Sequence, residues 1–383
     1  MLELRKFVAP EFIFGLGALD LVGRYAGNFG ARKAFIVTDE GVVNSGITQQ
    51  VIDNLKAIGL EFSLFTAISP NPRAQEVMAG AEQYLSDSCD VIISVGGGSP
   101  MDCAKGIGIV TTNRRHILEF EGIDNVEIPG PPLICLPTTA GTAADVSQFA
   151  IISNREELIK IAIVSKTMVP DVALIDPAAT VSMDGYLTAC TGIDALVHAF
   201  EAYVSTAHAP ILDLHALNAI TLIFENLVPV LQEPGNMELR GRIALASLEA
   251  GLAFSNASLG AVHAMAHSCG GLLDMPHGEC NALLLDHVVA YNYPKAPERY
   301  RNIARAIGVP VDSMDSPAIK NEILQRIRQL KQEVGIIGGL KERGTVSADI
   351  PALARNAMKD PCMVTNPRVA AVRDIEVIYE EAL

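Results

Sequence analysis

The feature that most constrains the fold is an alternation of short apolar runs with helix-forming segments between about residues 31 and 176. Two stretches in this region, Ile47–Gly59 and Ala74–Leu85, have helical periodicity. Strands that alternate with helices form a parallel sheet with helices on both faces. The runs rich in β-branched residues are predicted to be its buried strands: Lys33–Asp39, Asp90–Gly98, Pro132–Thr142 and Asp171–Pro177.

After about Tyr186 the strand pattern ends, and every long segment has helical periodicity. We therefore predict two domains. Residues 1–183 form an α/β domain with a Rossmann-like parallel sheet, and residues 184–383 form an all-α domain. A chain of 383 residues is long enough for both.

Composition excludes some classes of function. The chain has 29 Lys and Arg against 44 Asp and Glu, a formal charge of −15 that argues against a nucleic-acid partner. Its seven cysteines are dispersed without a CxxC pair, which indicates reduced thiols and a cytoplasmic location. The first residues lack the apolar core of a signal peptide, and no long apolar run predicts a membrane span.

A glycine run follows the second predicted strand and precedes a helix, in the stretch Val91–Val110. Residues Gly96–Gly98 let a phosphate approach the backbone closely, and the N–H groups at a helix N-terminus bind anions. We expect Ser99 to be the N-cap of this helix and Pro100 to lie in its first turn. The alternative is a tight turn that needs glycine only for steric reasons.

Polar residues follow two of the predicted strands. Asp39 ends the first one, where a carboxylate accepts hydrogen bonds from a ribose diol and repels a 2′-phosphate, so it favours NAD over NADP. The alternative is an ordinary N-cap aspartate. Thr138, Thr139 and Thr142 offer hydroxyl groups to a cofactor at the end of another strand, or form only a polar turn.

Seven of the eight histidines lie between His198 and His287. Asp194 and His198 are four residues apart and so share a helix face, and His263 and His267 repeat that spacing. With His277 they offer a nitrogen-rich donor set that suits Fe(II) or Zn(II) in a catalytic role. Spacing alone would pair His263 with His267 at the metal, and an Asp–His pair can also be a simple ion pair.

These motifs together resemble the iron-containing (group III) alcohol dehydrogenase family, in its branch with lactaldehyde reductase and 1,3-propanediol dehydrogenase. The resemblance rests on "IVTDEG", "GGGSPMD", "PTTAGTAADVS", "TGIDALVHAFEAYVS", "HAMAHSCGG", "PHGECNALLLDHV" and "TNPR", which span nearly the whole chain. It implies the fold of the dehydroquinate synthases, with an NAD-binding N-terminal domain and a helical metal-binding C-terminal domain. It also implies a homodimer or larger homo-oligomer.

The resemblance also assigns site residues. It implies that the metal ligands are Asp194, His198, His263 and His277. His267 then lies near the nicotinamide and is our candidate catalytic residue, as a proton relay. The implied cofactor-binding residues are Asp39, Asn71, Gly97, Gly98, Ser99, Asp102, Thr138, Thr139, Thr142 and Lys160.

The function predicted is reversible hydride transfer between NAD and a small primary alcohol or diol and its aldehyde, with the metal acting as a Lewis acid on the substrate hydroxyl. Phe149 and Phe254 either line an apolar pocket for short alcohols or pack in the core. Two alternatives stay open: another metal and NAD reaction on the same scaffold, such as a sugar-phosphate cyclisation, and a non-catalytic NAD-binding sensor.

Overall fold

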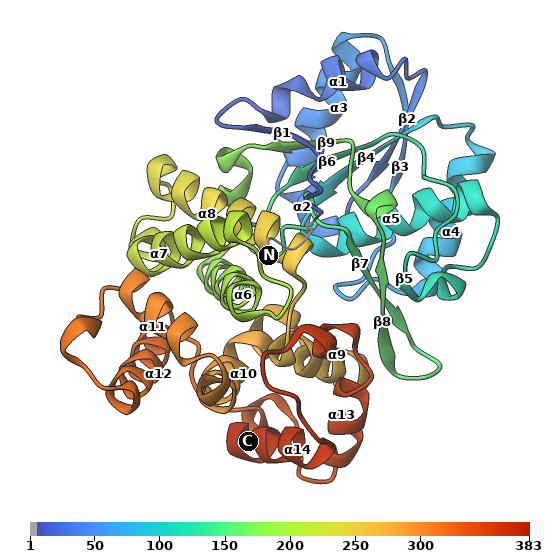
Figure 1. Cartoon of the computed structure of the whole chain (residues 1–383). Coiled ribbons are helices and arrows are strands. Elements are labelled where there is room, and N and C mark those ends of the chain that lie inside the picture. Colours follow the sequence, from blue (N-terminus) through green and yellow to red (C-terminus); the bar gives the residue numbers. More distant parts are fainter. Residues whose placement is uncertain (1–5) are drawn as a thin grey trace. The chain divides into compact units, whose positions relative to one another are not determined.

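The computed structural model describes residues 6–383. Two compact units make up this chain. The first unit is residues 8–183, and the second is residues 184–383 together with residues 6 and 7, where the Phe7 ring lies 6.4 Å from that of His215. Figure 1 follows the chain through both units by colour.

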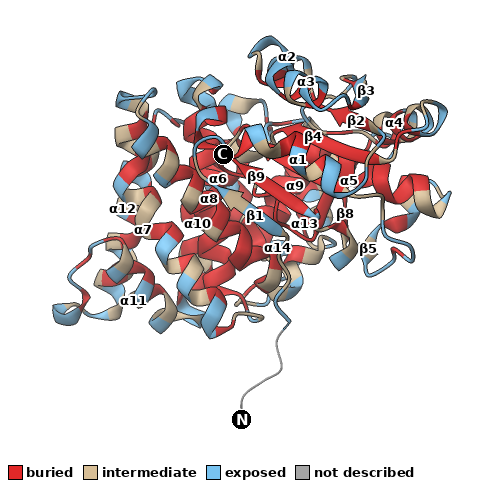
Figure 2. Cartoon of the chain, turned by 90° about the horizontal axis from the view of Figure 1, so that it is seen from above, coloured by how far each residue is buried: buried red, intermediate tan, exposed pale blue. Residues whose placement is uncertain are grey.

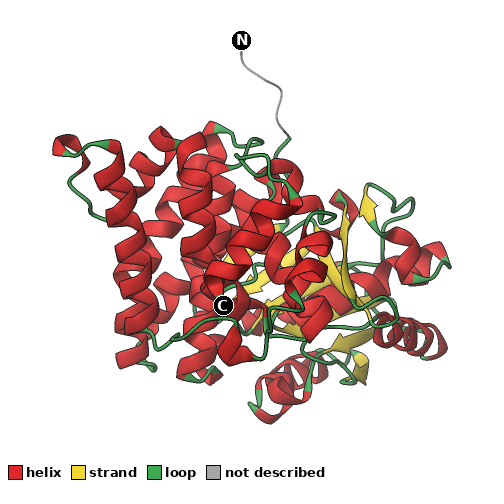
Figure 3. Cartoon of the chain, turned by 90° about the horizontal axis from the view of Figure 1, so that it is seen from below, coloured by secondary structure: helices red, strands yellow, loops and turns green. Residues whose placement is uncertain are grey.

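The first unit is built on a six-stranded, all-parallel sheet with the strand order β1-β9-β6-β4-β2-β3. All four strands predicted from the sequence are present, and the predicted α/β class is confirmed. Every strand of the described residues lies in this unit, and Figure 3 draws the strands in yellow. The strands are β1 (Glu11–Phe14), β2 (Lys33–Val37), β3 (Glu61–Phe65), β4 (Val91–Gly96), β6 (Leu133–Pro137) and β9 (Val172–Ile175).

Helices cover both faces of this sheet because its central strands are apolar on both sides. Every residue of β4 and β6 is buried, and Figure 2 shows β4 in red. One apolar cluster packs α1 and α3 on the sheet, and another packs α4 and α5 on the other face. The helices of the unit are α1 (Val22–Asn28), α2 (Glu40–Asn44), α3 (Ile47–Ala57), α4 (Ala74–Ser86) and α5 (Gly98–Asn113).

A second, three-stranded sheet was not predicted. It has the order β5-β8-β7 and contains β5 (Gly122–Ile123), β7 (Phe149–Asn154) and β8 (Ile159–Val164). The strands β7 and β8 pair antiparallel, and the register joins Phe149 to Val164.

The second unit is entirely helical within the described residues. The helix α6 lies at its centre, since every residue from Thr188 to Val204 is buried, and it packs against α7, α8 and α10. The helices are α6 (Gly185–Val204), α7 (Pro210–Gln232), α8 (Met237–Ala257), α9 (Ala261–Leu273), α10 (His277–Asn292), α11 (Pro297–Ala306), α12 (Ser316–Glu333), α13 (Ile350–Ala357) and α14 (Val372–Ala382).

Helix α7 is the one helix among residues 6–383 that is long and apolar enough to cross a membrane, with a mean hydropathy of 1.5 over its most apolar window. A core helix of a water-soluble protein has the same length and composition. Helix α7 packs against α6 and α8, and its buried residues include Ala216, Ile220, Ile223 and Leu227. One face of α7 is therefore buried within the helical unit, and 39% of its most apolar window is buried.

Candidate functional site

Three of the four predicted metal ligands converge in the helical unit. Asp194 lies on α6, His263 on α9, and His277 is the first residue of α10. The Oδ1 atom of Asp194 lies 3.8 Å from Nε2 of His263 and 3.7 Å from Nε2 of His277. Asp194 and His263 are each 1% exposed. The structure therefore gathers one carboxylate and two imidazoles from three helices, with Asp194 and His263 buried and the His277 side chain 25% exposed.

The three donor atoms surround one amide group, that of Asn281. Its Nδ2 atom lies 2.6 Å from Oδ1 of Asp194 and 3.2 Å from Nε2 of both His263 and His277. An amide nitrogen has two hydrogens and cannot satisfy three acceptors at once. Three acceptors that face one point fit a cation, so these residues fit a divalent metal.

The fourth predicted ligand, His198, lies beside this group. It is one helical turn after Asp194 on α6, is 4% exposed, and its ring stacks on that of His263 with the centroids 4.4 Å apart. Its other face packs on Phe254, at 4.2 Å between centroids. Phe254 therefore packs against a histidine of the cluster.

A buried glutamate on α6 fixes the orientation of His263. The Nδ1 atom of His263 lies 2.7 Å from Oε2 of Glu201. Burial and the neighbouring His267 lower the pKa of His263 well below its usual value, which disfavours the protonated ring. In the tautomer with its hydrogen on Nδ1, His263 donates to the Glu201 carboxylate and Nε2 keeps its lone pair. Burial raises the pKa of Glu201 to about 7, although the backbone N–H groups that donate to its carboxylate act to lower that pKa.

His267 has a different partner. Its Nδ1 donates to Oδ2 of Asp360 at 2.8 Å, and its ring stacks on that of His277 at 5.1 Å between centroids. Burial alone would raise the pKa of Asp360, but His267 and the N–H of Cys362 outweigh it and lower that pKa. His267, Asp360 and Cys362 form a second close group of donor atoms. His263 thus groups with His277, not with His267 as its spacing suggests.

The glycine loop joins β4 to α5, and one expectation about it is wrong. Gly97, not Ser99, is the N-cap of α5, which begins at Gly98. The Ser99 hydroxyl donates instead to the carbonyl oxygen of Pro70 at 3.1 Å. Gly96 has φ of 152°, and a Cβ atom there would lie 2.6 Å from Cγ of Pro100, so this position also needs glycine for steric reasons.

The threonine loop (residues 138–142) packs directly on the glycine loop (residues 96–98). A Cβ atom on Gly97 would lie 3.1 Å from Oγ1 of Thr139, and one on Gly98 would lie 3.1 Å from Cγ2 of Thr142. The backbone N–H of Thr138 donates to the carbonyl of Gly96 at 2.9 Å. Hydroxyl groups and a helix N-terminus therefore meet at the carboxyl ends of β4 and β6, where parallel α/β sheets bind ligands.

The other predicted cofactor residues lie in three places. Asp39 follows β2 and is the N-cap of α2, with its Oδ1 accepting from the N–H of Val42 at 2.9 Å. Lys160 on β8 donates to Oδ1 of Asn71 at 2.8 Å. Asp102 on α5 accepts from the N–H of Ile151 at 3.1 Å and so ties β7 to α5.

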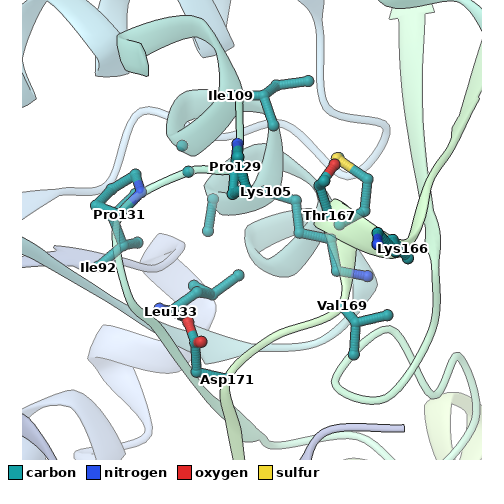
Figure 4. Close-up of a pocket in the computed structure, with 14 residues that line it drawn as sticks. Ile92, Lys105, Ile109, Pro129, Pro131, Leu133, Lys166, Thr167, Val169 and Asp171 are labelled. Carbon is teal, nitrogen blue, oxygen red and sulfur yellow. Dashed lines mark hydrogen bonds between the residues drawn. The ribbon is translucent and has the colours of Figure 1, made fainter. Parts of the chain in front are cut away.

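A separate cavity of about 260 Å³ lies at the opposite, amino edge of the sheet (Figure 4). Ile92 of β4 and Leu133 of β6 line it at the start of their strands, together with Asp171, which precedes β9. Lys105 also lines it, yet its ammonium group donates elsewhere, to Ser147 and Phe149. This cavity is therefore not the predicted cofactor site.

Sequence reasoning missed Glu201, Asn281 and Asp360. Glu201 is seven residues after Asp194, two helical turns along α6, and Asn281 is four residues after His277 on α10. Those spacings place each residue on the face of its helix that carries a ligand. Asp360 precedes a short 3-10 helix (Pro361–Thr365) and carries no such signal.

Two family models match this chain. The model described as "Iron-containing alcohol dehydrogenase" matches residues 9–177, and "Fe-containing alcohol dehydrogenase family, C-terminal" matches residues 188–383. A solved structure of 1,3-propanediol oxidoreductase aligns with a TM-score of 0.96 at 38% identity and covers 100% of both chains.

Curated relatives are similar over nearly their whole length. The 1,3-propanediol dehydrogenase of Klebsiella pneumoniae is 39% identical over 96% of both chains. The NAD-dependent methanol dehydrogenase of Bacillus methanolicus is 36% identical over 98% of this chain and 99% of its own. The lactaldehyde reductase of Escherichia coli (strain K12) is 37% identical over 96% of this chain and 97% of its own.

Proposed function

The chain belongs to the iron-containing alcohol dehydrogenase family, and from that premise we propose that it transfers hydride reversibly between NAD and a small primary alcohol or diol and its aldehyde. It is an alcohol and aldehyde oxidoreductase of the branch with 1,3-propanediol dehydrogenase and lactaldehyde reductase. The observation that carries the proposal is the convergence of Asp194, His263 and His277 on one point in the helical unit. Neither the cyclisation nor the sensor alternative is favoured.

The proposed metal ligands are Asp194, His198, His263 and His277. A divalent cation there, Fe(II) with Zn(II) as the alternative, would act as a Lewis acid on the substrate hydroxyl. Asp194 supplies the negative charge of the donor set, and His263 presents a neutral Nε2 because Glu201 holds its Nδ1–H. The burial of both side chains excludes water and strengthens their interaction with charge.

NAD, the hydride acceptor, is proposed to bind to residues 1–183. The backbone N–H groups of Gly97, Gly98 and Ser99 lie at the N-terminus of α5 and are suited to bind the pyrophosphate. The hydroxyl groups of Thr139 and Thr142 beside them could donate to its oxygen atoms. Asp39 would accept from the adenosine ribose and repel a 2′-phosphate, which favours NAD over NADP. The remaining proposed contacts are Asn71, Asp102, Thr138, Thr139, Thr142 and Lys160.

His267 is the proposed proton relay. Its Nδ1–H donates to Asp360, so Nε2 is the atom that can take up a proton from the substrate hydroxyl. The ring stacks on His277, which places it against the proposed ligands.

A second copy of the chain is the proposed macromolecular partner. The strand β1 is an edge of the parallel sheet, and Phe12, Phe14 and Leu16 on and after it are 39%, 38% and 66% exposed. An edge strand with exposed apolar side chains is a surface that another chain can cover. We propose a homodimer or larger homo-oligomer in the cytoplasm, with no nucleic-acid or membrane partner. Sedimentation equilibrium of the purified protein tests this, and a monomer at micromolar concentration contradicts it.

One experiment tests the metal and the reaction together. The protein is purified without oxygen or chelators, its metal content is measured, and NADH absorbance is followed with a panel of small alcohols and added NAD. The variant His263→Ala is expected to lose both the metal and the turnover, whereas His215→Ala, on the surface of α7, retains both. Normal NADH production by metal-free His263→Ala contradicts the proposal.

A further inference from the structure

Glu201 is a buried carboxylate that the proposed ligand set does not include. It lies on α6 two helical turns after Asp194 and is 4% exposed. Within residues 6–383 no lysine or arginine lies within ion-pair distance of it, and its one histidine partner at that distance is His263. A carboxylate so placed costs free energy unless its oxygens accept hydrogen bonds.

Its hydrogen bonds all come from the start of α9. Oε1 accepts from the backbone N–H of Val262 at 2.6 Å, and Oε2 lies 2.7 Å from Nδ1 of His263. The backbone N–H of His263 lies 3.4 Å from Oε2. The backbone N–H groups of Val262 and His263 are among those that a helix leaves without intrahelical partners at its N-terminus. The carboxylate therefore stabilises the first turn of α9.

The backbone just before α9 leaves room for this contact. A Cβ atom on Gly260 would lie 3.0 Å from Oε1 of Glu201 and 2.9 Å from Oδ1 of Asn366. Asn366 accepts from the N–H of Ala261 at 3.2 Å, so each of the first three N–H groups of α9 has a side-chain acceptor nearby. Residues outside α9 therefore hold the first turn of α9, which carries His263.

The contact also decides which ring nitrogen of His263 can bind a cation. A neutral imidazole has one N–H and one lone pair, and a carboxylate only accepts. When Glu201 is ionised, the hydrogen lies on Nδ1 and the lone pair on Nε2, which lies 3.8 Å from Oδ1 of Asp194. Carboxylates that hold the other nitrogen of a metal-binding histidine fix its tautomer and its orientation.

We propose that Glu201 is a positioning residue of the metal centre: it holds His263 as the Nδ1–H tautomer with Nε2 directed at Asp194 and His277. The inference rests on the proposed function, since it requires a cation at these residues. It adds a residue from the same helix as Asp194 that acts on the site only through His263.

The variant Glu201→Gln tests the tautomer with little change in shape. The amide oxygen can still accept from Val262, but the amide nitrogen then faces Nδ1 of His263 and can only donate. His263 would have to move its hydrogen to Nε2, where it blocks the cation. We expect the Kd of the metal-free protein for Co(II), followed by visible absorption without oxygen, to rise about tenfold to a hundredfold. The Co(II) spectrum at saturation should change as well.

Asp286→Asn is the matched control. It is the same acid-to-amide change at a carboxylate that is 2% exposed in the same unit, but Asp286 pairs with Arg328 and Lys331. We expect it to lower the melting temperature and to leave Co(II) affinity unchanged. Equal losses of affinity in the two variants would overturn the inference, as would wild-type affinity in a folded Glu201→Gln.

A measurement on the unaltered chain serves if Glu201→Gln does not fold. In metal-free protein labelled with ¹⁵N in histidine, long-range ¹H–¹⁵N spectra report which ring nitrogen carries hydrogen. His263 is assigned by its loss in His263→Gln, and we expect Nδ1–H. An Nε2–H form would overturn the role of Glu201. A wild-type protein that binds no Co(II) would instead overturn the metal centre and the proposed function with it.

Discussion

Gly278, next to the proposed ligand His277, lies at a tight contact between α10 and the backbone of α6. A Cβ atom there would lie 2.8 Å from the backbone carbonyl oxygen of Cys190, which cannot rotate away as a side chain could. Gly278→Ala should therefore move the start of α10 and His277 with it. We expect a loss of about 2 kcal/mol in the free energy of unfolding and a lower metal content.

Chemical denaturation and metal analysis measure both effects. The matched control is Gly185→Ala in α6, where the added Cβ would meet only Leu231, at 3.8 Å. A Gly278→Ala protein with the stability and metal content of Gly185→Ala would show that α10 can shift without cost.

Residue type and spacing in the sequence place Asp194, His198 and His263 in helices, and the family resemblance joins His277 to them as a ligand set. Spacing alone pairs His263 with His267, because it reports only neighbours on one helix. The structure instead joins His263 to Glu201 and Asn281, residues on other helices. Contacts between residues on different helices depend on how the helices pack. A single glutamate or asparagine in a helical sequence does not indicate which residue of another helix it will contact.

At the scale of elements, Lys105 ties α5 to the chain segment that follows the threonine loop. Its buried ammonium group donates to the carbonyl oxygens of Ser147 and Phe149 at 3.0 and 2.7 Å, and to the Ser147 hydroxyl at 3.2 Å. Lys105→Met leaves two buried carbonyls without these donors. We expect a loss of roughly 3 kcal/mol of stability and a weaker affinity for NAD.

Isothermal titration with NAD and urea denaturation test this, with Lys166→Met as the control because Lys166 is exposed. If Lys105→Met binds NAD like the wild type, the loop holds its position without this link.

The pairing of α10 with α12 gives a pH prediction. Burial alone would raise the pKa of Asp286, but Lys331, His287 and Arg328 outweigh it and hold that pKa below its usual value. A carboxyl group with a lowered folded pKa stabilises the fold above its unfolded pKa, about 3.9, and this contribution is lost as the pH falls through the folded pKa. Asp286→Asn should therefore cost about 2 kcal/mol at pH 7 and progressively less below about pH 4.

Urea denaturation of the wild type and of Asp286→Asn at a series of pH values measures the difference in their free energies of unfolding. A difference in unfolding free energy that stays constant down to pH 3 would contradict the assignment.

The elements that the sequence predicts well are those with strong apolar patterns. The strands β4 and β6 are buried along their whole length, so their apolar runs are continuous. β3 has one fully buried residue, and β1 is an exposed edge strand of four residues. The hairpin of β7 and β8 escapes prediction for a different reason: its strands pair antiparallel outside the main sheet, which the alternation of strands and helices does not suggest.

At the scale of the whole molecule, the proposed ligands separate by unit. All four proposed metal ligands lie in residues 184–383, and all proposed NAD contacts lie in residues 8–183. This division follows from the change of periodicity near Tyr186, because one half offers a helix N-terminus at a sheet edge and the other offers facing helices. Each ligand should then stabilise the unit that holds it.

Hydrogen exchange of the full chain tests this division. A ligand at a hundred times its Kd stabilises the state that binds it by about 2.7 kcal/mol. Amides of α6, α9 and α10 that exchange through opening of the helical unit should slow by up to about a hundredfold with Zn(II), and those of β4 and α5 with NAD. Because the two sites use no residue in common, Zn(II) alone should leave β4 and α5 nearly unchanged. Equal protection of both units by Zn(II) would mean that they open as a single cooperative body.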